Sequence, residues 1–165
     1  MIKHIGKGDT KNIIALSNSS AAVSHVLSPM ESSSLITISP DSSTSSRHIL
    51  IKLPAVAKGL TYSFVVLANS GNTANDIKFT SAHADNDIDG LIMGVEASDA
   101  NVAVTAATTC AWTIDSSVTN TYKYSRWTVT CDGTNWLLSD AIFRIAQDSM
   151  GVSGDTLLFS NAVLT

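Results

Sequence analysis

Thr130-Cys131-Asp132-Gly133-Thr134-Asn135-Trp136 is the stretch that decides the fold class of this 165-residue chain. Asp-Gly can take the positive φ angles of a type I′ turn, which joins two antiparallel strands through a two-residue loop. The flanking segments, Ser125–Cys131 and Asn135–Ser139, alternate apolar and polar side chains as half-buried strands do. The stretch therefore predicts a β-hairpin.

The same alternation assigns the large side chains of this hairpin to a core. Trp127, Val129 and Cys131 share one face of the first arm, and Trp136 and Leu138 share a face of the second. A buried indole contributes a large apolar area and has one N–H group to satisfy. We expect the tryptophans to be core residues rather than a platform on which a ligand stacks.

The rest of the chain repeats the pattern of short apolar runs between turns rich in Ser, Asn and Asp. The predicted strands are Leu35–Ser39, His48–Leu53, Thr61–Ala68, Ile77–Thr80, Val102–Ala106, Cys110–Ile114, Ser125–Cys131, Asn135–Ser139 and Thr156–Ser160. Only Ala141–Gln147 has room for two helical turns. The pattern predicts an all-β fold, an antiparallel β-sandwich of the jelly-roll kind.

We expect residues 1–165 to form one domain, because the chain is long enough to bury a continuous core without metal or disulfide. The β core is expected over residues 13–146. Residues 1–12 are expected to form a flexible N-terminal arm, and residues 147–165 a C-terminal arm or an added strand.

Composition narrows the possible partners. The formal net charge is −4, and the ten Lys and Arg residues are scattered singly, so no basic stripe could neutralise a phosphate backbone. No apolar run approaches the roughly 20 residues that cross a bilayer. The stretch Ile13–Leu16 is too short for the core of a secretory signal. We therefore expect no nucleic-acid partner, no membrane span and no export.

Cys110 and Cys131 lack the Cys-x-x-Cys spacing of zinc and redox sites. Cys110, Trp112 and Ile114 alternate, so an antiparallel pairing that sets Cys110 opposite Cys131 would also set Ile114 opposite Trp127. A cross-strand disulfide would fit that register. Two small buried thiols packed among aromatic rings are the other interpretation.

Residues Asp85–Glu96 match the twelve-residue calcium-loop pattern, with carboxylates at positions 1, 3, 5 and 12 and Gly90 at position 6. That pattern works in proteins because helices hold the loop on both sides. Here the flanking segments, Ile77–Ser81 and Val102–Thr105, are typical of strands. A calcium site on a β-loop remains one interpretation, and a solvated turn whose Gly90 takes a conformation closed to other residues is the other.

We identify no catalytic residues, no cofactor site and no metal site. The chain has no Gly-x-Ser-x-Gly elbow, no His-Glu-x-x-His helix motif, no phosphate-binding loop and no dinucleotide fingerprint. Its histidines, which are His4, His25, His48 and His83, lie far apart in the sequence, and none belongs to a metal-ligand pair. The sequence predicts that the protein is not an enzyme.

Several blocks between Arg47 and Asp140 carry a resemblance to a known class. They are the segment Leu53-Pro-Ala through Gly59-Leu-Thr-Tyr-Ser-Phe-Val-Val66, the strand Asn75–Thr80, the Asp-Ile-Asp-Gly segment Asp87–Gly90 and the hairpin Arg126–Ser139. This order resembles structural proteins of tailed phages, especially marine ones. It covers a little over half the chain. In that light the acidic loop resembles the class's Asp-x-Ile-x-Gly turn, which weakens the calcium interpretation.

The resemblance implies a virion protein, and a capsid decoration (cement) protein is the expected role. Such a protein binds the outer capsid surface beside the major capsid protein, self-associates as a homotrimer and stabilises the shell by strand addition and loop packing. The chain departs from the pattern in its long stretch Ala97–Thr121 and in continuing past the hairpin. Either segment could be an arm that contacts a neighbour.

Two alternatives involve recognition of a host or a glycan. One is a host-recognition module of a tail fibre or spike, but this chain has no repeat. The other is a carbohydrate-binding β-sandwich, for which Tyr122 and Tyr124, spaced to share one face of a strand, are the pair we nominate. The contact residues for any capsid partner are not identifiable from the sequence.

Overall fold

The computed structural model describes residues 12–19, 21–41, 47–68, 75–84, 87–96, 102–114, 122–145 and 157–160. It is built of strands, apart from one short 3-10 turn at Pro29–Glu31. The strands are β1 (Ile13–Ser17), β2 (Val23–Val26), β3 (Leu35–Ser39), β4 (Ile49–Lys52), β5 (Thr61–Val66), β6 (Ile77–Thr80), β7 (Ile88–Glu96), β8 (Val102–Thr109), β9 (Ala111–Ile114), β10 (Arg126–Cys131), β11 (Trp136–Ile145) and β12 (Leu157–Ser160). No helix in the described residues is long and apolar enough to cross a membrane.

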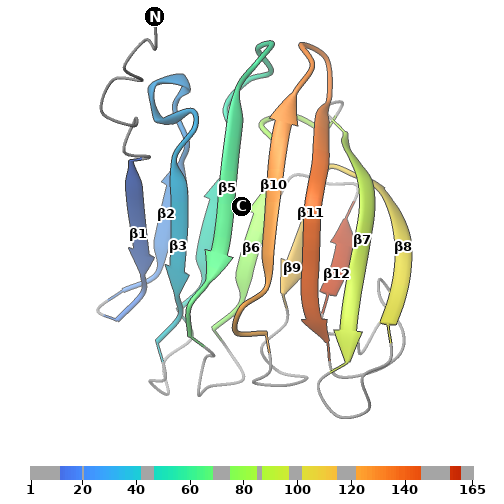
Figure 1. Cartoon of the computed structure of the whole chain (residues 1–165). Coiled ribbons are helices and arrows are strands. Elements are labelled where there is room, and N and C mark those ends of the chain that lie inside the picture. The colour runs from blue at the N-terminus through green and yellow to red at the C-terminus, as the bar shows by residue number, and fades with distance from the viewer. Residues whose placement is uncertain are drawn as a thin grey trace, which may run out of the picture.

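The strands form two sheets that pack face to face (Figure 1). Sheet A has seven strands in the order β1-β3-β5-β10-β11-β7-β8, and sheet B has five in the order β12-β9-β6-β4-β2. The prediction of an all-β sandwich is therefore confirmed. The jelly-roll arrangement is not confirmed.

The sheets are mixed rather than antiparallel, which corrects the prediction. From β1 to β6 the chain alternates between the sheets, so β1, β3 and β5 run parallel in sheet A and β2, β4 and β6 run parallel in sheet B. Each of the strands β2 to β5 therefore forms part of the crossover between two parallel strands of the other sheet. Turn residues end a strand in the same way whether the chain folds back or crosses over, so the sequence did not distinguish these connections.

The predicted hairpin forms between β10 and β11, with Cys131 opposite Trp136 and Val129 opposite Leu138. All four of these side chains are buried, as predicted. The turn type was wrong, because the loop has four residues and only Gly133 has a positive φ, of +113°. The Asp132 carboxylate closes the loop by accepting hydrogen bonds from the N–H groups of Thr134 (2.7 Å) and Asn135 (2.8 Å).

Aromatic rings fill the centre of the sandwich. In sheet A, Trp127 stacks between Phe64 (centroids 5.0 Å apart) and Phe143 (5.2 Å). In sheet B, Phe79 stacks on Trp112 at 4.5 Å. The two groups meet across the core, where the Trp112 and Trp127 centroids are 6.0 Å apart in an edge arrangement. The prediction that the tryptophans are core residues is confirmed, since none is more than 1 % exposed.

Other predictions of single elements need correction. Ala141–Gln147 was the helix candidate, but its part up to Ile145 continues β11, with Ala141 and Phe143 buried alternately. Strands β1, β2 and β7 were missed, because β1 and β2 are short and overlap the Ser- and Ala-rich stretch Ser17–Ser24, and β7 contains two glycines and an Asp. The other predicted strands agree with observed ones, with small shifts at their ends.

The termini were predicted to be arms. Within residues 147–165, Leu157–Ser160 forms β12, which pairs antiparallel with β9 at the edge of sheet B, so an added strand is present there. The rest of that segment lies outside the described residues. The N-terminal arm also lies outside them, except for Asn12, whose carbonyl accepts a hydrogen bond from the N–H of Leu35 at 2.9 Å.

Candidate functional site

The calcium-loop segment is a strand for most of its length. Ile88–Glu96 forms β7, which lies between β11 and β8, while Asp85 and Asn86 lie outside the described residues. An extended strand turns its side chains alternately to opposite faces, so it cannot wrap its oxygens around one ion as a calcium loop does. Among the described residues, no three His, Cys, Asp or Glu side chains are grouped to hold a metal.

Gly90 is required for close packing rather than for a turn. It lies in β7 opposite Leu138 of β11. A Cβ atom on Gly90 would come within 2.6 Å of the Leu138 carbonyl oxygen and 2.7 Å of the Leu138 Cβ. The interpretation of the segment Asp85–Glu96 as a solvated turn is therefore wrong from Ile88 onward, but the expectation that position 90 excludes other residues has a structural reason.

The cysteines lie apart from each other in the fold. Cys131 ends β10 in sheet A, whereas Cys110 precedes β9 in sheet B, so the antiparallel register proposed between them does not exist. Neither forms a disulfide, and both thiols are buried. Burial raises the pKa of the Cys110 thiol above its usual value, which lowers its reactivity. The interpretation as buried thiols is confirmed, and the disulfide is wrong.

The nominated tyrosines do not form a platform. Tyr122 is buried at 1 % exposure, while Tyr124 is 57 % exposed and has a φ of +73°. Both precede β10, in a turn where the alternation of a strand does not apply. Their predicted common face is therefore wrong. The carbohydrate-binding interpretation loses the pair on which it rested.

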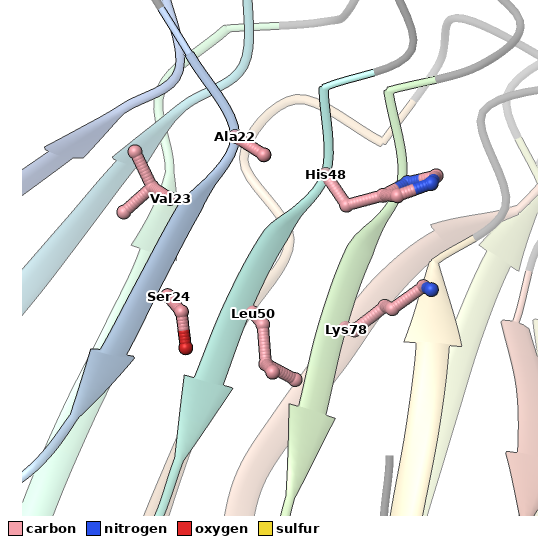
Figure 2. A pocket seen from close by; sticks show the side chains of 6 residues that line it. All are labelled: Ala22, Val23, Ser24, His48, Leu50 and Lys78. Atoms are coloured by element: carbon pink, nitrogen blue, oxygen red, sulfur yellow. The ribbon is translucent and has the colours of Figure 1, made fainter. Parts of the chain in front are cut away.

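A shallow hollow on the outer face of sheet B brings His48 and Lys78 together with Ser24 and Leu50 (Figure 2). Its volume is about 210 Å³. His48 Nδ1 lies 3.5 Å from Asp76 Oδ2, an ion-pair distance but not a hydrogen bond. In Figure 2 the His48 ring points away from Ser24, and Leu50 lies between Ser24 and Lys78. This arrangement does not join a serine nucleophile to a histidine base, whose atoms need to approach within about 3.2 Å.

The remaining histidines have structural surroundings. His25 Nε2 lies 3.1 Å from Glu31 Oε1, and the other oxygen of Glu31 accepts the Ser28 N–H at 2.7 Å. His83 is exposed in the turn after β6, and His4 lies outside the described residues. His25 thus lies in β2, His48 lies just before β4, and His83 lies in a turn.

A β-bulge in β11 shapes the outer face of sheet A. Between Leu138 and Ala141, β11 has one residue more than β10 on one side and β7 on the other. The extra residue reverses the alternation, so Trp136 and Leu138 point inward before the bulge and Ala141 and Phe143 after it. Asp140 takes a φ of +51° within the bulge and is exposed.

Two shallow hollows meet at Asp140. One, of about 260 Å³, is lined by Ser63, Arg126, Thr128 and Asp140 among others. The second, of about 270 Å³, is lined by Leu91, Met93, Asp140 and Ile142 among others. Leu91 is 66 % exposed and Met93 41 %. We call Leu91, Met93, Ile142, Asp140 and Arg126 the β7–β11 face.

The β7–β11 face is suited to a macromolecular partner. Pockets for small molecules usually have volumes of about 300–1,000 Å³ and enclose their ligand. Each hollow here is smaller and open. Exposed apolar side chains beside a few charged groups are what a protein interface presents. Sequence reasoning missed this face because the bulge that forms it reverses the alternation of buried and exposed residues in β11. The polar pair Ser139-Asp140 was the only feature of the sequence that indicated this bulge.

Comparison of the chain with protein-family models, with curated proteins and with solved structures finds no match.

Proposed function

We propose that this chain is a capsid decoration protein of a tailed phage, which binds the outer surface of the shell formed by the major capsid protein and stabilises it without catalysis. The resemblance of the segment Leu53–Val66 and of the hairpin Arg126–Ser139 to phage structural proteins supports the class. Both segments are central in the fold, since β5 and β10 pair with each other in sheet A.

The β7–β11 face is the observation that carries the proposal. It combines exposed Leu91 and Met93 with the half-buried Ile142, and it has one charge of each sign, Asp140 and Arg126. Burying the apolar side chains against a shell protein would drive binding, and the two charges would orient it. The aromatic core lies beneath the face, where Trp127 of β10 stacks on Phe143 of β11.

The proposal can be tested by adding the purified protein to capsids that lack it. Wild type is expected to bind to saturation. Leu91→Lys is expected to bind at least about tenfold more weakly, because a lysine buried in the contact without a partner would cost more than 1.4 kcal/mol. Met30→Lys is the matched control, because Met30 is 93 % exposed and lies in the 3-10 turn that follows β2, outside strands β7, β10 and β11.

Equal binding by wild type and Leu91→Lys would remove the β7–β11 face from the proposal. Failure of the wild type to bind capsids would contradict the decoration role itself. Binding to a tail fraction instead, at a few copies per particle, would favour the host-recognition module.

A further inference from the structure

One end of the sandwich presents two unpaired strand edges. β1 is the outermost strand of sheet A and β2 the outermost strand of sheet B, and both lie at the same end of the molecule (Figure 1). In the described part of the chain, no strand pairs with the outer edge of either. A free edge is a template on which another strand can add.

The hydrogen-bond register identifies the groups on these edges. The N–H of Leu35 donates to Asn12 O, so in the parallel ladder Ile14 and Leu16 direct their backbone groups to β3. The N–H and C=O groups of Ile13, Ala15 and Ser17 therefore point outward.

The same reasoning applies to β2. The N–H of Val23 donates to His48 O and that of Leu27 to Lys52 O, so Val23 and His25 direct their backbone groups to β4. The backbone groups of Ser24 and Val26 then point outward. Within the described residues, two rows of donors and acceptors remain without a partner strand, one on each sheet.

Neither edge strand carries a lysine, a proline or a bulge, which are among the devices by which proteins block strand addition. β1 reads Ile-Ile-Ala-Leu-Ser and β2 reads Val-Ser-His-Val, and both pair with their neighbours without a register shift. Ile13 is 68 % exposed and Val26 60 %. The core also reaches this end, because Ile14 and Val23 pack against it while only partly buried.

A second copy of the chain fits this end better than a single peptide strand. One added strand would satisfy one row and leave the other open. A two-fold axis perpendicular to both sheets would pair β1 of one copy with β1 of the other, and β2 with β2. Both pairs would be antiparallel and would join strands of equal length. Such an interface sets the same two strands of both copies against each other, so it requires edges without repelling charges. Apart from His25, β1 and β2 contain no ionisable side chain.

We propose that two copies associate through these edges, with Ala15 of one chain opposite Ala15 of the other. In that register Ala15 exchanges both of its outward hydrogen bonds with its counterpart, and Ile13 pairs with Ser17 of the second copy. The small alanine side chain lets the strands approach at the axis. Ile14 and Val23 become buried, and both sheets become continuous across the pair.

The mass of the full chain in solution tests the inference, by light scattering after size exclusion across a range of concentrations. Wild type is expected at twice the chain mass of 17.3 kDa. Ala15→Lys and Ala15→Glu are each expected to run as monomers, because like charges would face each other at the axis. An equimolar mixture of the two variants is expected to regain the double mass. Leu67→Lys, the control for an added charge, is expected to keep it.

Monomeric wild type, a trimeric mass, or Ala15 variants that keep the wild-type mass would overturn the inference. A trimer, which the resemblance to phage proteins implies, would require the β1–β2 end to meet a different surface of the next copy. Circular dichroism melting identifies a variant that has failed to fold, and rescue in the mixture requires two folded partners. The inference is separate from capsid binding, because the folded monomeric variants retain the β7–β11 face and can be tested on capsids alone.

Discussion

Gly90 shows how one residue without a side chain fixes the spacing of two strands. Its position opposite Leu138 leaves no room for a Cβ, because the nearest atoms are backbone and the first side-chain carbon of β11, which cannot swing away. Gly90 thus lets β7 approach β11 just before the bulge at Asp140. The β7–β11 face depends on that approach, since the two strands supply its apolar residues.

Gly90→Ala is expected to lower the free energy of unfolding by about 1–3 kcal/mol or more, as overpacking does in a rigid interior. Gly59→Ala is the comparison, because Gly59 has a φ of +88° but nothing within 4 Å of a Cβ. It should suffer only the backbone strain of about 1–2 kcal/mol that a left-handed conformation imposes. Urea denaturation measures both. A smaller loss for Gly90→Ala than for Gly59→Ala would contradict the close approach.

Asp132 gives the hairpin loop a dependence on pH. The hydrogen bonds that its carboxylate accepts from the N–H groups of Asn135 and Thr134 lower its pKa below the usual value. A group whose pKa is lower in the folded state stabilises the fold above the pKa of the unfolded chain, about 3.9 for Asp. That contribution is lost as the pH falls through the lowered pKa.

The denaturation midpoint of the wild type is therefore expected to exceed that of Asp132→Asn by a constant amount between about pH 5 and 7. Below about pH 4 the difference should shrink toward zero, because the protonated carboxyl and the amide are both neutral. A difference that persists unchanged at about pH 2.5 would show that the charge of Asp132 does not stabilise the loop.

At the scale of elements, the stacked rings join the two sheets. Trp127 lies in the middle, in contact with Phe64 and Phe143 of its own sheet and with Phe79 and Trp112 of the other. Its indole N–H has no hydrogen-bond partner among the described residues. Its contribution to stability therefore comes from packing.

Trp127→Ala is expected to cost about 3–5 kcal/mol, the usual loss for a large aromatic side chain removed from a core. Trp127→Phe should cost less than about half as much, because it keeps a ring in the stack and removes an unpartnered donor. Both values come from urea denaturation of the full chain. Equal losses for the two variants would mean that the indole N–H makes a bond that matters.

The placement of β9 and β10 in different sheets predicts the state of the cysteines. Titration of the unfolded chain is expected to find two thiols, with or without prior reduction, because Cys110 and Cys131 form no disulfide. In the folded chain both should react slowly, since both are buried. Loss of both thiols in the sample without reductant would contradict the observed arrangement of β9 and β10.

Local sequence patterns predicted the elements that are determined by neighbouring residues, namely turn residues and the alternation of apolar and polar side chains. Asp132-Gly133 between alternating residues was sufficient for the β10–β11 hairpin, and the periodicity of residues 127–131 identified its buried face. β11 was cut short at Ser139 because the bulge moves the buried set from even to odd positions, and a fixed period of two cannot follow that change. β7 was missed because Asp89 and Gly90 are typical of turns, while the reason for Gly90 is a contact with β11.

At the scale of the whole molecule, the alternation of β1 to β6 between the sheets could not be predicted. Each of these strands pairs with a strand two elements away, such as β3 with β5 across β4, and no turn residue specifies that partner. The open β1–β2 end follows from this topology, whereas the β7–β11 face follows from the bulge in β11 and its pairing with β7. Neither has a motif of its own, which is why sequence reasoning nominated Tyr122, Tyr124 and the acidic segment instead.

The decoration role is the central claim, and the composition of virus particles tests it most directly. Particles would be purified from cells that produce the protein, and the ratio of this chain to the major shell protein would be measured by quantitative mass spectrometry. Our account predicts copies in numbers comparable to those of the shell protein, on particles that lack tails as well as on complete ones. A few copies per particle, or none on tailless capsids, would contradict it.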